Sequence, residues 1–276
     1  MPQTRILLVD DDEAINIMLA EVLRGQGFDV TMAASVPQAL KLISSNVYDV
    51  LLSDLHMPGV GDGLTVVSAM RHANPKAVTM LLSAFPEMDA ASHAIMLQAD
   101  QILVKPMNVT ALVKAINERL AGGAPAVRPV ETVAAILERT TDSTIADWFE
   151  HIQLDKKVMT VPLNYKQRTC HLPQLFSELV HRLRSSKIIG SPELVSPAAA
   201  EHGLNRQRQG YTAAMLVEES RMLQVSIFQT LQNNLASIDF SVLLIGVMTI
   251  ADEIDSQLSQ AMASYVVESA NSSVPA

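Results

Sequence analysis

Short β-rich runs alternate with segments of helical periodicity over the first 120 residues. Between the runs, apolar residues recur three or four positions apart, as Ile15, Leu19 and Leu23 do. Ser35 and Asn108 stand where two of these helices would begin, and each can cap a helix N-terminus. The runs occupy residues 5–9, 29–33, 50–53, 77–83 and 101–104. Five strand–helix units predict a doubly wound α/β domain, in which helices cover both faces of a five-stranded parallel sheet.

From about residue 130 the apolar spacing is helical throughout, and no alternating strand pattern occurs. Two long segments, at about 212–235 and 241–265, each carry one apolar stripe, which predicts two long helices. We therefore expect an all-α helical bundle over residues 130–270. Residues 121–129 contain two Gly and two Pro and are expected to link this bundle to a first domain at 1–120. Residues 271–276 are expected to form a disordered tail.

The composition suits two folded domains in a chain of 276 residues, of which 49% are hydrophobic and 4% aromatic. The net charge is −9 and neither half is basic, which argues against nucleic acid as a partner. The single cysteine, Cys170, cannot form an internal disulfide and suits a reducing compartment. The longest apolar stretch, residues 240–251, is shorter than the roughly 20 residues of a membrane span. With no signal-peptide pattern at the N-terminus, we expect a cytoplasmic protein without a membrane partner.

Four short polar motifs follow apolar runs in the first domain, at residues 9–12, 52–58, 82–84 and 104–106. In doubly wound sheets, ligands bind beyond the carboxyl ends of the strands, where these motifs should meet. Asp10, Asp11 and Asp54 would bring three carboxylates together there, and a Mg²⁺ ion would offset their repulsion. Lys105 and Ser83 could each contact a phosphoryl oxygen. Asp54 is then the expected nucleophile, which would form an acyl phosphate.

With these motifs in place, residues 4–120 resemble the CheY-like receiver domain of bacterial two-component response regulators. The resemblance implies a flavodoxin-like fold and phosphotransfer from a histidine kinase to Asp54. It also implies that Asp10, Asp11 and Asp54 bind Mg²⁺ together with the main-chain carbonyl of His56. Ser83 and Lys105 would contact the phosphoryl group. Such a protein accepts a phosphoryl group and is not otherwise an enzyme, apart from autophosphorylation by small phosphodonors and autodephosphorylation.

Two features depart from the pattern of that family. The turn at residues 59–63 is one residue longer than usual. Ile102 stands three residues before Lys105, where many receivers have an aromatic residue that turns inward when the hydroxyl residue moves to the phosphate. We therefore expect the Ser83 part of the switch to be retained and the part at Ile102 to be altered.

The helical half offers two histidine motifs. The segment from His181 to Ser186 is similar to the pattern of histidine phosphotransfer domains, but a plain polar-face position for His181 explains it better, because the Gly of that pattern is missing. Residues 201–212, with the helix after them, resemble the helical domain of RsbRD-type stress-response co-antagonists. Capping roles are expected for His202 and Tyr211, and haem ligation by His202 stays open. His171, next to Cys170, has no second metal-binding pair nearby in sequence, so no zinc site is expected there.

The function expected is that of a response regulator that signals through protein–protein contacts of its helical domain. Two alternatives stay open. One is a phosphorelay intermediate in which His181 carries the phosphoryl group, and the other is a transcriptional regulator with an unrecognised DNA-binding bundle. The expected partners are a histidine kinase and an unidentified protein that binds the helical domain, and a homodimer is also open. The sequence names neither the kinase nor the input signal.

Overall fold

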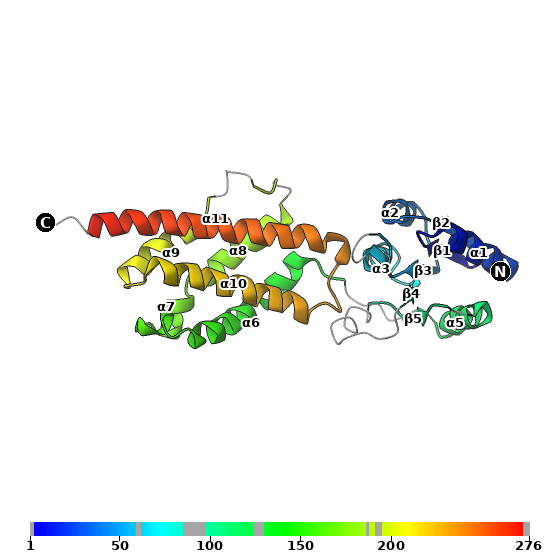
Figure 1. Cartoon of the computed structure of the whole chain (residues 1–276), viewed down its shortest axis with the longest axis horizontal. Coiled ribbons are helices and arrows are strands. Elements are labelled where there is room, and N and C mark those ends of the chain that lie inside the picture. Colours follow the sequence, from blue (N-terminus) through cyan, green and yellow to red (C-terminus); the bar gives the residue numbers. More distant parts are fainter. Residues whose placement is uncertain are drawn as a thin grey trace. The chain divides into compact units, whose positions relative to one another are not determined.

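The computed structural model describes residues 3–58, 62–84, 98–106, 108–123, 130–185, 188–190 and 195–272. The chain forms two compact units (Figure 1). Unit 1 comprises Met1–Val130 together with Leu235–Ser241, and unit 2 comprises Glu131–Asn234 together with Val242–Ala276. Most of the expected linker, residues 124–129, lies outside the described residues.

Unit 1 is built on a parallel five-stranded sheet in the order β2-β1-β3-β4-β5. This order and the flanking helices confirm the predicted doubly wound fold. The register pairs Val9 with Ser53 and Ser83 with Val104. Asp54 directly follows Ser53, and Lys105 directly follows Val104. The strands are β1 (Arg5–Val9), β2 (Asp29–Ala33), β3 (Val50–Asp54), β4 (Val78–Ser83) and β5 (Gln101–Val104).

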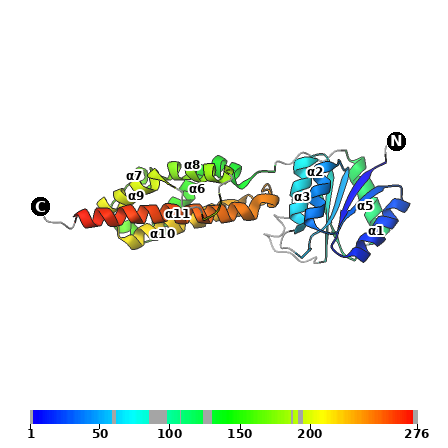
Figure 2. The same cartoon turned by 90° about the horizontal axis from the view of Figure 1, so that it is seen from above.

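Helices cover both faces of this sheet, with α2 and α3 on one face and α1 and α5 on the other (Figure 2). Because β1, β3 and β4 are buried on both sides, their sequences are continuous apolar runs and do not alternate. The predicted caps are confirmed: Ser35 accepts a hydrogen bond from the Gln38 N–H, and Asn108 accepts one from Thr110. The helices are α1 (Glu13–Gly25), α2 (Val36–Ser45), α3 (Asp62–Ala73) and α5 (Val109–Ala121).

Unit 1 also contains a segment that the sequence pattern assigned to the helical half. The side chain of Gln98 is 1% exposed, and its Nε2 donates to the carbonyls of Leu235 at 2.7 Å and Ile238 at 2.8 Å. Its Oε1 accepts from the hydroxyl of Ser68 in α3 at 3.1 Å. Ile238 is fully buried. Leu235–Ser241 is therefore held in unit 1 by a buried amide, although it lies more than a hundred residues beyond Val130.

The described part of unit 2 is helical, which confirms the all-α expectation. Thr212 caps α10 as predicted, accepting a hydrogen bond from the Met215 N–H. The last helix runs to Ser272, so residues 271–272 are helical and only 273–276 of the expected tail lie outside the described residues. The elements are α6 (Val133–Leu154), η1 (Val158–Thr160), α7 (Tyr165–Thr169), α8 (Leu172–Arg184), α9 (Pro197–Arg208), α10 (Ala213–Asn233) and α11 (Phe240–Ser272).

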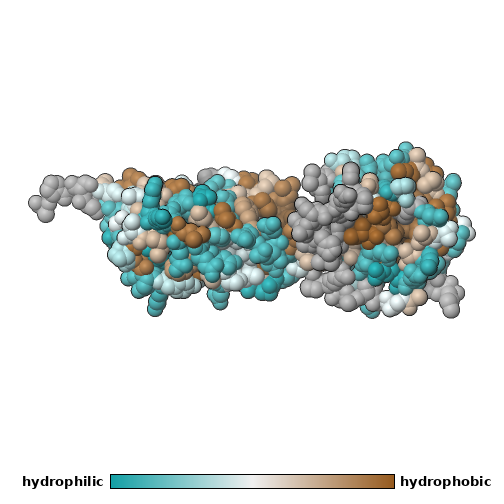
Figure 3. Space-filling model, turned by 60° about the horizontal axis from the view of Figure 1, so that its bottom comes forward, coloured by the Kyte–Doolittle hydropathy of each residue, from teal (hydrophilic) through white to brown (hydrophobic). Residues whose placement is uncertain are grey.

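The helices of unit 2 are amphipathic, and no described helix is both long and apolar enough to cross a bilayer. Their apolar stripes are buried, as Ile136, Leu179 and Ile254 illustrate. The outer face seen in Figure 3 mixes hydrophilic residues with smaller apolar patches. Trp148 of α6 is fully buried and donates from Nε1 to the carbonyl of Glu219 at 3.0 Å, which ties α6 to α10.

Two glycines of unit 2 mark close helix–helix contacts. A Cβ atom at Gly203 of α9 would lie 1.9 Å from the carbonyl oxygen of Ala261 in α11. A Cβ atom at Gly246 of α11 would lie 2.8 Å from a side-chain carbon of Val133. The first clash involves backbone, and the second involves a side chain that can rotate.

We expect Gly203→Ala to lower the free energy of unfolding of unit 2 by about 1–3 kcal/mol, because α9 and α11 must move apart. Gly246→Ala is the matched control, since it adds the same methyl group to a helix of the same unit. Its smaller clash is offset by the gain in helix propensity of up to ~1 kcal/mol. Denaturant titrations followed by Trp148 fluorescence measure both variants, and equal stabilities would contradict the backbone clash at Gly203.

Candidate functional site

Three carboxylates meet at the carboxyl ends of β1 and β3. Asp10 and Asp11 directly follow β1, and Asp54 is the last residue of β3. One oxygen from each of the three carboxylates lies within 4.8 Å of the others. Asp10 is 1% exposed and Asp54 is 9% exposed, whereas Asp11 is open to solvent. The parallel pairing of the two strands thus brings together the acids that the sequence motifs singled out.

Lys105 joins two of these carboxylates from the end of β5. Its Nζ lies 2.8 Å from Oδ2 of Asp10 and 2.9 Å from Oδ2 of Asp54. Burial lowers the pKa of Lys105, but its hydrogen bonds and charge interactions with Asp10 and Asp54 outweigh that effect and raise the pKa above the usual lysine value. One ammonium facing three carboxylates leaves an excess of negative charge, so the site can accept a divalent cation.

Main-chain N–H groups orient two of these carboxylates, and a side-chain amide holds the main chain beside them. The N–H of Asp12 donates to Oδ1 of Asp10 at 3.0 Å, and the N–H of His56 donates to Oδ1 of Asp54 at 3.2 Å. The amide of Asn16, buried in α1, donates to the carbonyls of Asp10 at 2.9 Å and Ala33 at 2.8 Å. Asn16 was not predicted from the sequence, although a buried Asn on an apolar helix face is a usable signal.

Gly63 is a second residue that the sequence motifs did not single out. A Cβ atom there would lie 2.3 Å from the carbonyl oxygen of Asp54, which is backbone and cannot turn away. Only glycine therefore allows the first turn of α3 to pass this close to the end of β3. The longer turn that precedes it, residues 59–61, lies outside the described residues.

The two expected switch residues lie on neighbouring strands. Ser83 ends β4 and is fully buried, and its carbonyl accepts a hydrogen bond from the N–H of Lys105 at 2.7 Å. Ile102, on β5, is 37% exposed. Ser83 is thus placed beside Lys105, at the same edge of the sheet as the carboxylates, while Ile102 lies on the outermost strand.

His181 and two arginines of α8 differ in exposure. His181 is exposed, as a phosphotransfer residue or a plain surface residue would be. Arg182 is 4% exposed and pairs with Asp252 at 3.3 Å, so it is not available to nucleic acid. Arg184 pairs with Glu138 on the surface.

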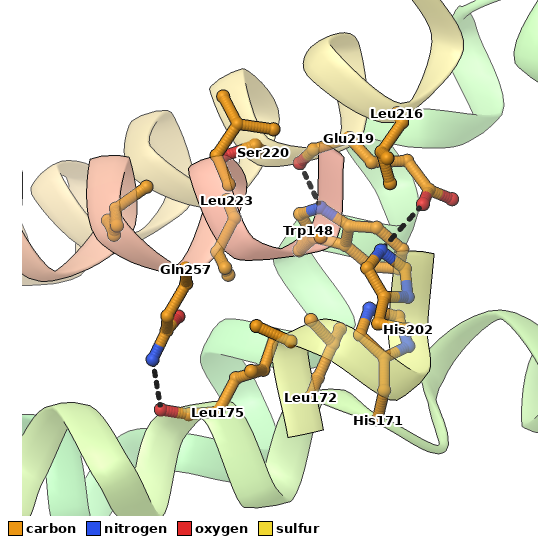
Figure 4. A pocket seen from close by; sticks show the side chains of 14 residues that line it. Trp148, His171, Leu172, Leu175, His202, Leu216, Glu219, Ser220, Leu223 and Gln257 are labelled. Carbon is orange, nitrogen blue, oxygen red and sulfur yellow. Dashed lines mark hydrogen bonds and ion pairs between the residues drawn. The ribbon is translucent and has the colours of Figure 1, made fainter. Parts of the chain in front are cut away.

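The expectation that His202 caps a helix is wrong. His202 lies inside α9, 8% exposed, and its ring stacks on that of His171 with 3.7 Å between centroids. The main chain of Tyr211 does close the end of α9, since its N–H donates to the Arg206 carbonyl. The cavity beside the two histidines measures about 30 Å³, which leaves no room for a porphyrin (Figure 4).

Comparison with known proteins gives a match in unit 1. Residues 6–117 match the family model of the response regulator receiver domain. Among curated proteins, the transcriptional regulatory protein ZraR of Klebsiella oxytoca is 32% identical over 142 residues, which are 51% of this chain and 32% of that protein. The DNA-binding transcriptional regulator NtrC of Escherichia coli is 30% identical over 42% of this chain and 24% of its own length. This chain therefore spans about a third or less of these relatives.

Solved structures of receiver domains and response regulators also match part of the chain. A CheY-like receiver domain protein from Methanospirillum hungatei is 24% identical, with a TM-score of 0.40, over 44% of this chain and 95% of that one. The response regulator TrrA of Thermotoga maritima, in complex with Mg²⁺ and BeF, is 31% identical, with a TM-score of 0.37, over 42% of this chain and 98% of that one.

We expect Mg²⁺ affinity to fall at least tenfold in Asp11→Ala and to change little in Asp12→Ala. The Asp12 carboxylate already accepts hydrogen bonds from the N–H groups of Ala14 at 2.9 Å and Ile15 at 3.1 Å, which makes it the cap of α1. The Asp11 carboxylate faces Asp10 and Asp54 instead. Calorimetric Mg²⁺ titration of the two variants distinguishes the roles, and equal losses would show that the acidic run is wrongly assigned.

Proposed function

We propose, from the premise that residues 6–117 are a response regulator receiver domain, that this protein is phosphorylated on Asp54 by a histidine kinase. The observation that carries the proposal is the placement of Lys105 between the carboxylates of Asp10 and Asp54. Once Asp54 carries a phosphoryl group, the ammonium of Lys105 is close enough to pair with one of the phosphoryl oxygens.

The residues at the site fit a Mg²⁺ ion, which Asp10, Asp11, Asp54 and the His56 carbonyl would hold. When bound, the ion neutralises charge between the carboxylates and the incoming phosphoryl oxygens. An oxygen of Asp54 attacks phosphorus, the phosphorus–nitrogen bond of the phosphohistidine breaks, and an acyl phosphate forms. Lys105 then pairs with a phosphoryl oxygen, and the Ser83 hydroxyl donates to another.

We infer that the helical unit carries the output through contact with another protein. The chain has the chemistry of a phosphoacceptor, and its own catalysis is confined to autophosphorylation from small phosphodonors and autodephosphorylation. Receiver activation shifts a population between two states, so Asp54 phosphorylation acts on the partner only through contacts that differ between those states.

Transcriptional regulation is a second candidate, because ZraR and NtrC are named as transcriptional regulators. Those names do not support our expectation that nucleic acid is an unlikely partner. Residues 121–276 contain 12 Lys and Arg against 16 Asp and Glu, a net charge of −4, which disfavours binding to DNA of any sequence. Binding of the full chain to random DNA that weakens steeply with salt would favour this second candidate.

Phosphorelay through His181 is the third candidate, and the chemistry of the label separates it from the first. An aspartyl phosphate is stable in acid and labile in alkali, whereas a phosphohistidine shows the opposite behaviour. A chase of radiolabelled full-length protein therefore distinguishes retention on Asp54 from transfer to His181.

We expect Asp54→Asn to abolish labelling by acetyl phosphate and Mg²⁺, because the amide cannot form the acyl phosphate. The matched control is Asp49→Asn, since Asp49 directly precedes β3 at its opposite end and accepts a hydrogen bond from the N–H of Arg5 at 2.8 Å. Intact-protein mass spectrometry should show one added phosphoryl group in the wild type and the control. Full labelling of Asp54→Asn would contradict the assignment of Asp54 as the phosphoryl acceptor.

Coupling to the helical unit is expected to depend on Ser83 more than on Ile102, because the aliphatic Ile102 offers a smaller packing difference between two states than an aromatic ring. We expect the coupling to lie at the low end of the roughly 1–3 kcal/mol typical of allosteric proteins. Hydrogen exchange in residues 131–234, with and without a beryllofluoride phosphoryl mimic, measures it. Ser83→Ala should abolish the change in protection and Ile102→Tyr should preserve it; an unaffected Ser83→Ala would refute this route.

A further inference from the structure

Three metal-ligating side chains meet inside unit 2, away from the carboxylates of unit 1. His171 directly precedes α8, His202 lies in α9 and Glu219 lies in α10. One ligand atom from each lies within 4.8 Å of the other two. Figure 4 shows the two imidazole rings and the Glu219 carboxylate close together, with Leu216 beside Glu219 and Leu172 beside His171.

The two imidazoles have no hydrogen-bond partner among the described residues. Nε2 of His202 lies 3.5 Å from Oε2 of Glu219, a contact drawn as a dashed line in Figure 4. The two rings stack on each other, and the His171 ring also meets Trp148 edge-on with 6.3 Å between centroids. Both histidines and Glu219 line the cavity, so a small ion inside it would lie close to all three side chains.

The size of the cavity limits what that occupant is. Its volume is about 30 Å³, enough for one or two waters or a single ion. A cavity that takes up benzene measures about 150 Å³ on the same kind of scale. An organic ligand would therefore have to separate the helices, whereas an ion would not.

We propose that His171, His202 and Glu219 bind a divalent first-row transition-metal ion inside the helical unit. Two imidazoles and one carboxylate are a donor set suited to zinc and its neighbours, and they leave a coordination position open towards the cavity. Mg²⁺ prefers an all-oxygen set, so the two sites of the chain would select different ions.

The surroundings of Glu219 fit the role of an oriented metal ligand. Its Oε2 accepts from Nε of Arg206 at 2.8 Å, and its Oε1 accepts from the hydroxyl of Tyr211 at 2.7 Å. Hydrogen bonds of this kind fix the direction of a ligating carboxylate, and lone pairs are left for an ion. The positive charge of Arg206 opposes a second cation, so the affinity is moderate.

The stacking of the two histidine rings has a consequence for binding. Parallel rings cannot both point a lone pair at one ion about 2.1 Å away. The stack must open on binding, and the His171 ring then moves against Trp148.

Full-length protein saturated with Mg²⁺ and titrated with Zn²⁺ or Co²⁺ tests the proposal. Trp148 is the only tryptophan of the chain, so Co²⁺ quenching of its emission reports on this site. Equilibrium dialysis with metal analysis gives the stoichiometry. The variant is His171→Gln, at the more exposed of the two histidines, and the control is His181→Gln, which removes an exposed histidine of α8.

We expect the wild type and His181→Gln to bind one more equivalent of Zn²⁺ than His171→Gln, with Co²⁺ quenching at least tenfold weaker in His171→Gln. Thermal unfolding should show that all three proteins are folded and that Zn²⁺ raises the Tm of the first two. If His171→Gln binds as much metal as the wild type, or if the wild type binds none beyond the Asp10–Asp54 site, the proposal fails. The histidine pair is then a stacked core contact beside a water-filled cavity.

Discussion

The ion pair between Lys105 and two strand-end carboxylates is the interaction on which the receiver site depends. It exists because β1 and β3 are parallel neighbours in register, which brings Asp10 beside Asp54 at one edge of the sheet. Lys105 reaches both from the end of β5, which is two places from β3 and three places from β1 in the sheet. Removing Lys105 would leave the carboxylates of Asp10 and Asp54 without their shared cation, which is costly for buried groups.

Much of unit 1 is predictable from local pattern. Apolar runs of four to seven residues, capping side chains and polar strand ends are all encoded within short windows, and they identified Asp54 and Lys105. The roles of Asn16 and Gly63 were not predicted, because they depend on residues that are distant in sequence and adjacent in the fold. For Gly63 that neighbour is the backbone of Asp54, and for Asn16 it is the carbonyl of Ala33 on another strand.

The interior of unit 2 is hard to predict for a related reason. Helical periodicity indicates which side of a helix is apolar, but not which charged residue of another helix it will meet. Arg206 looks like an ordinary polar residue in sequence, yet it is 1% exposed and bonded to Glu219, thirteen residues away on the next helix. His171 and His202 lie on separate elements and find each other only after α8 and α9 have packed. A buried polar network of this kind fixes the alignment of helices that apolar packing alone would leave free to slide.

The position of Leu235–Ser241 in unit 1 has a consequence for synthesis on the ribosome. Residues up to Val130 are translated first, but the segment that Gln98 holds is made about a hundred residues later, after the chain of α6 to α10. The nascent first unit is therefore incomplete while most of the second unit is produced. During that time the amide of Gln98 lacks these two carbonyl partners. The α/β unit is therefore completed only after most of the helical unit has been translated, when Leu235–Ser241 is added to it.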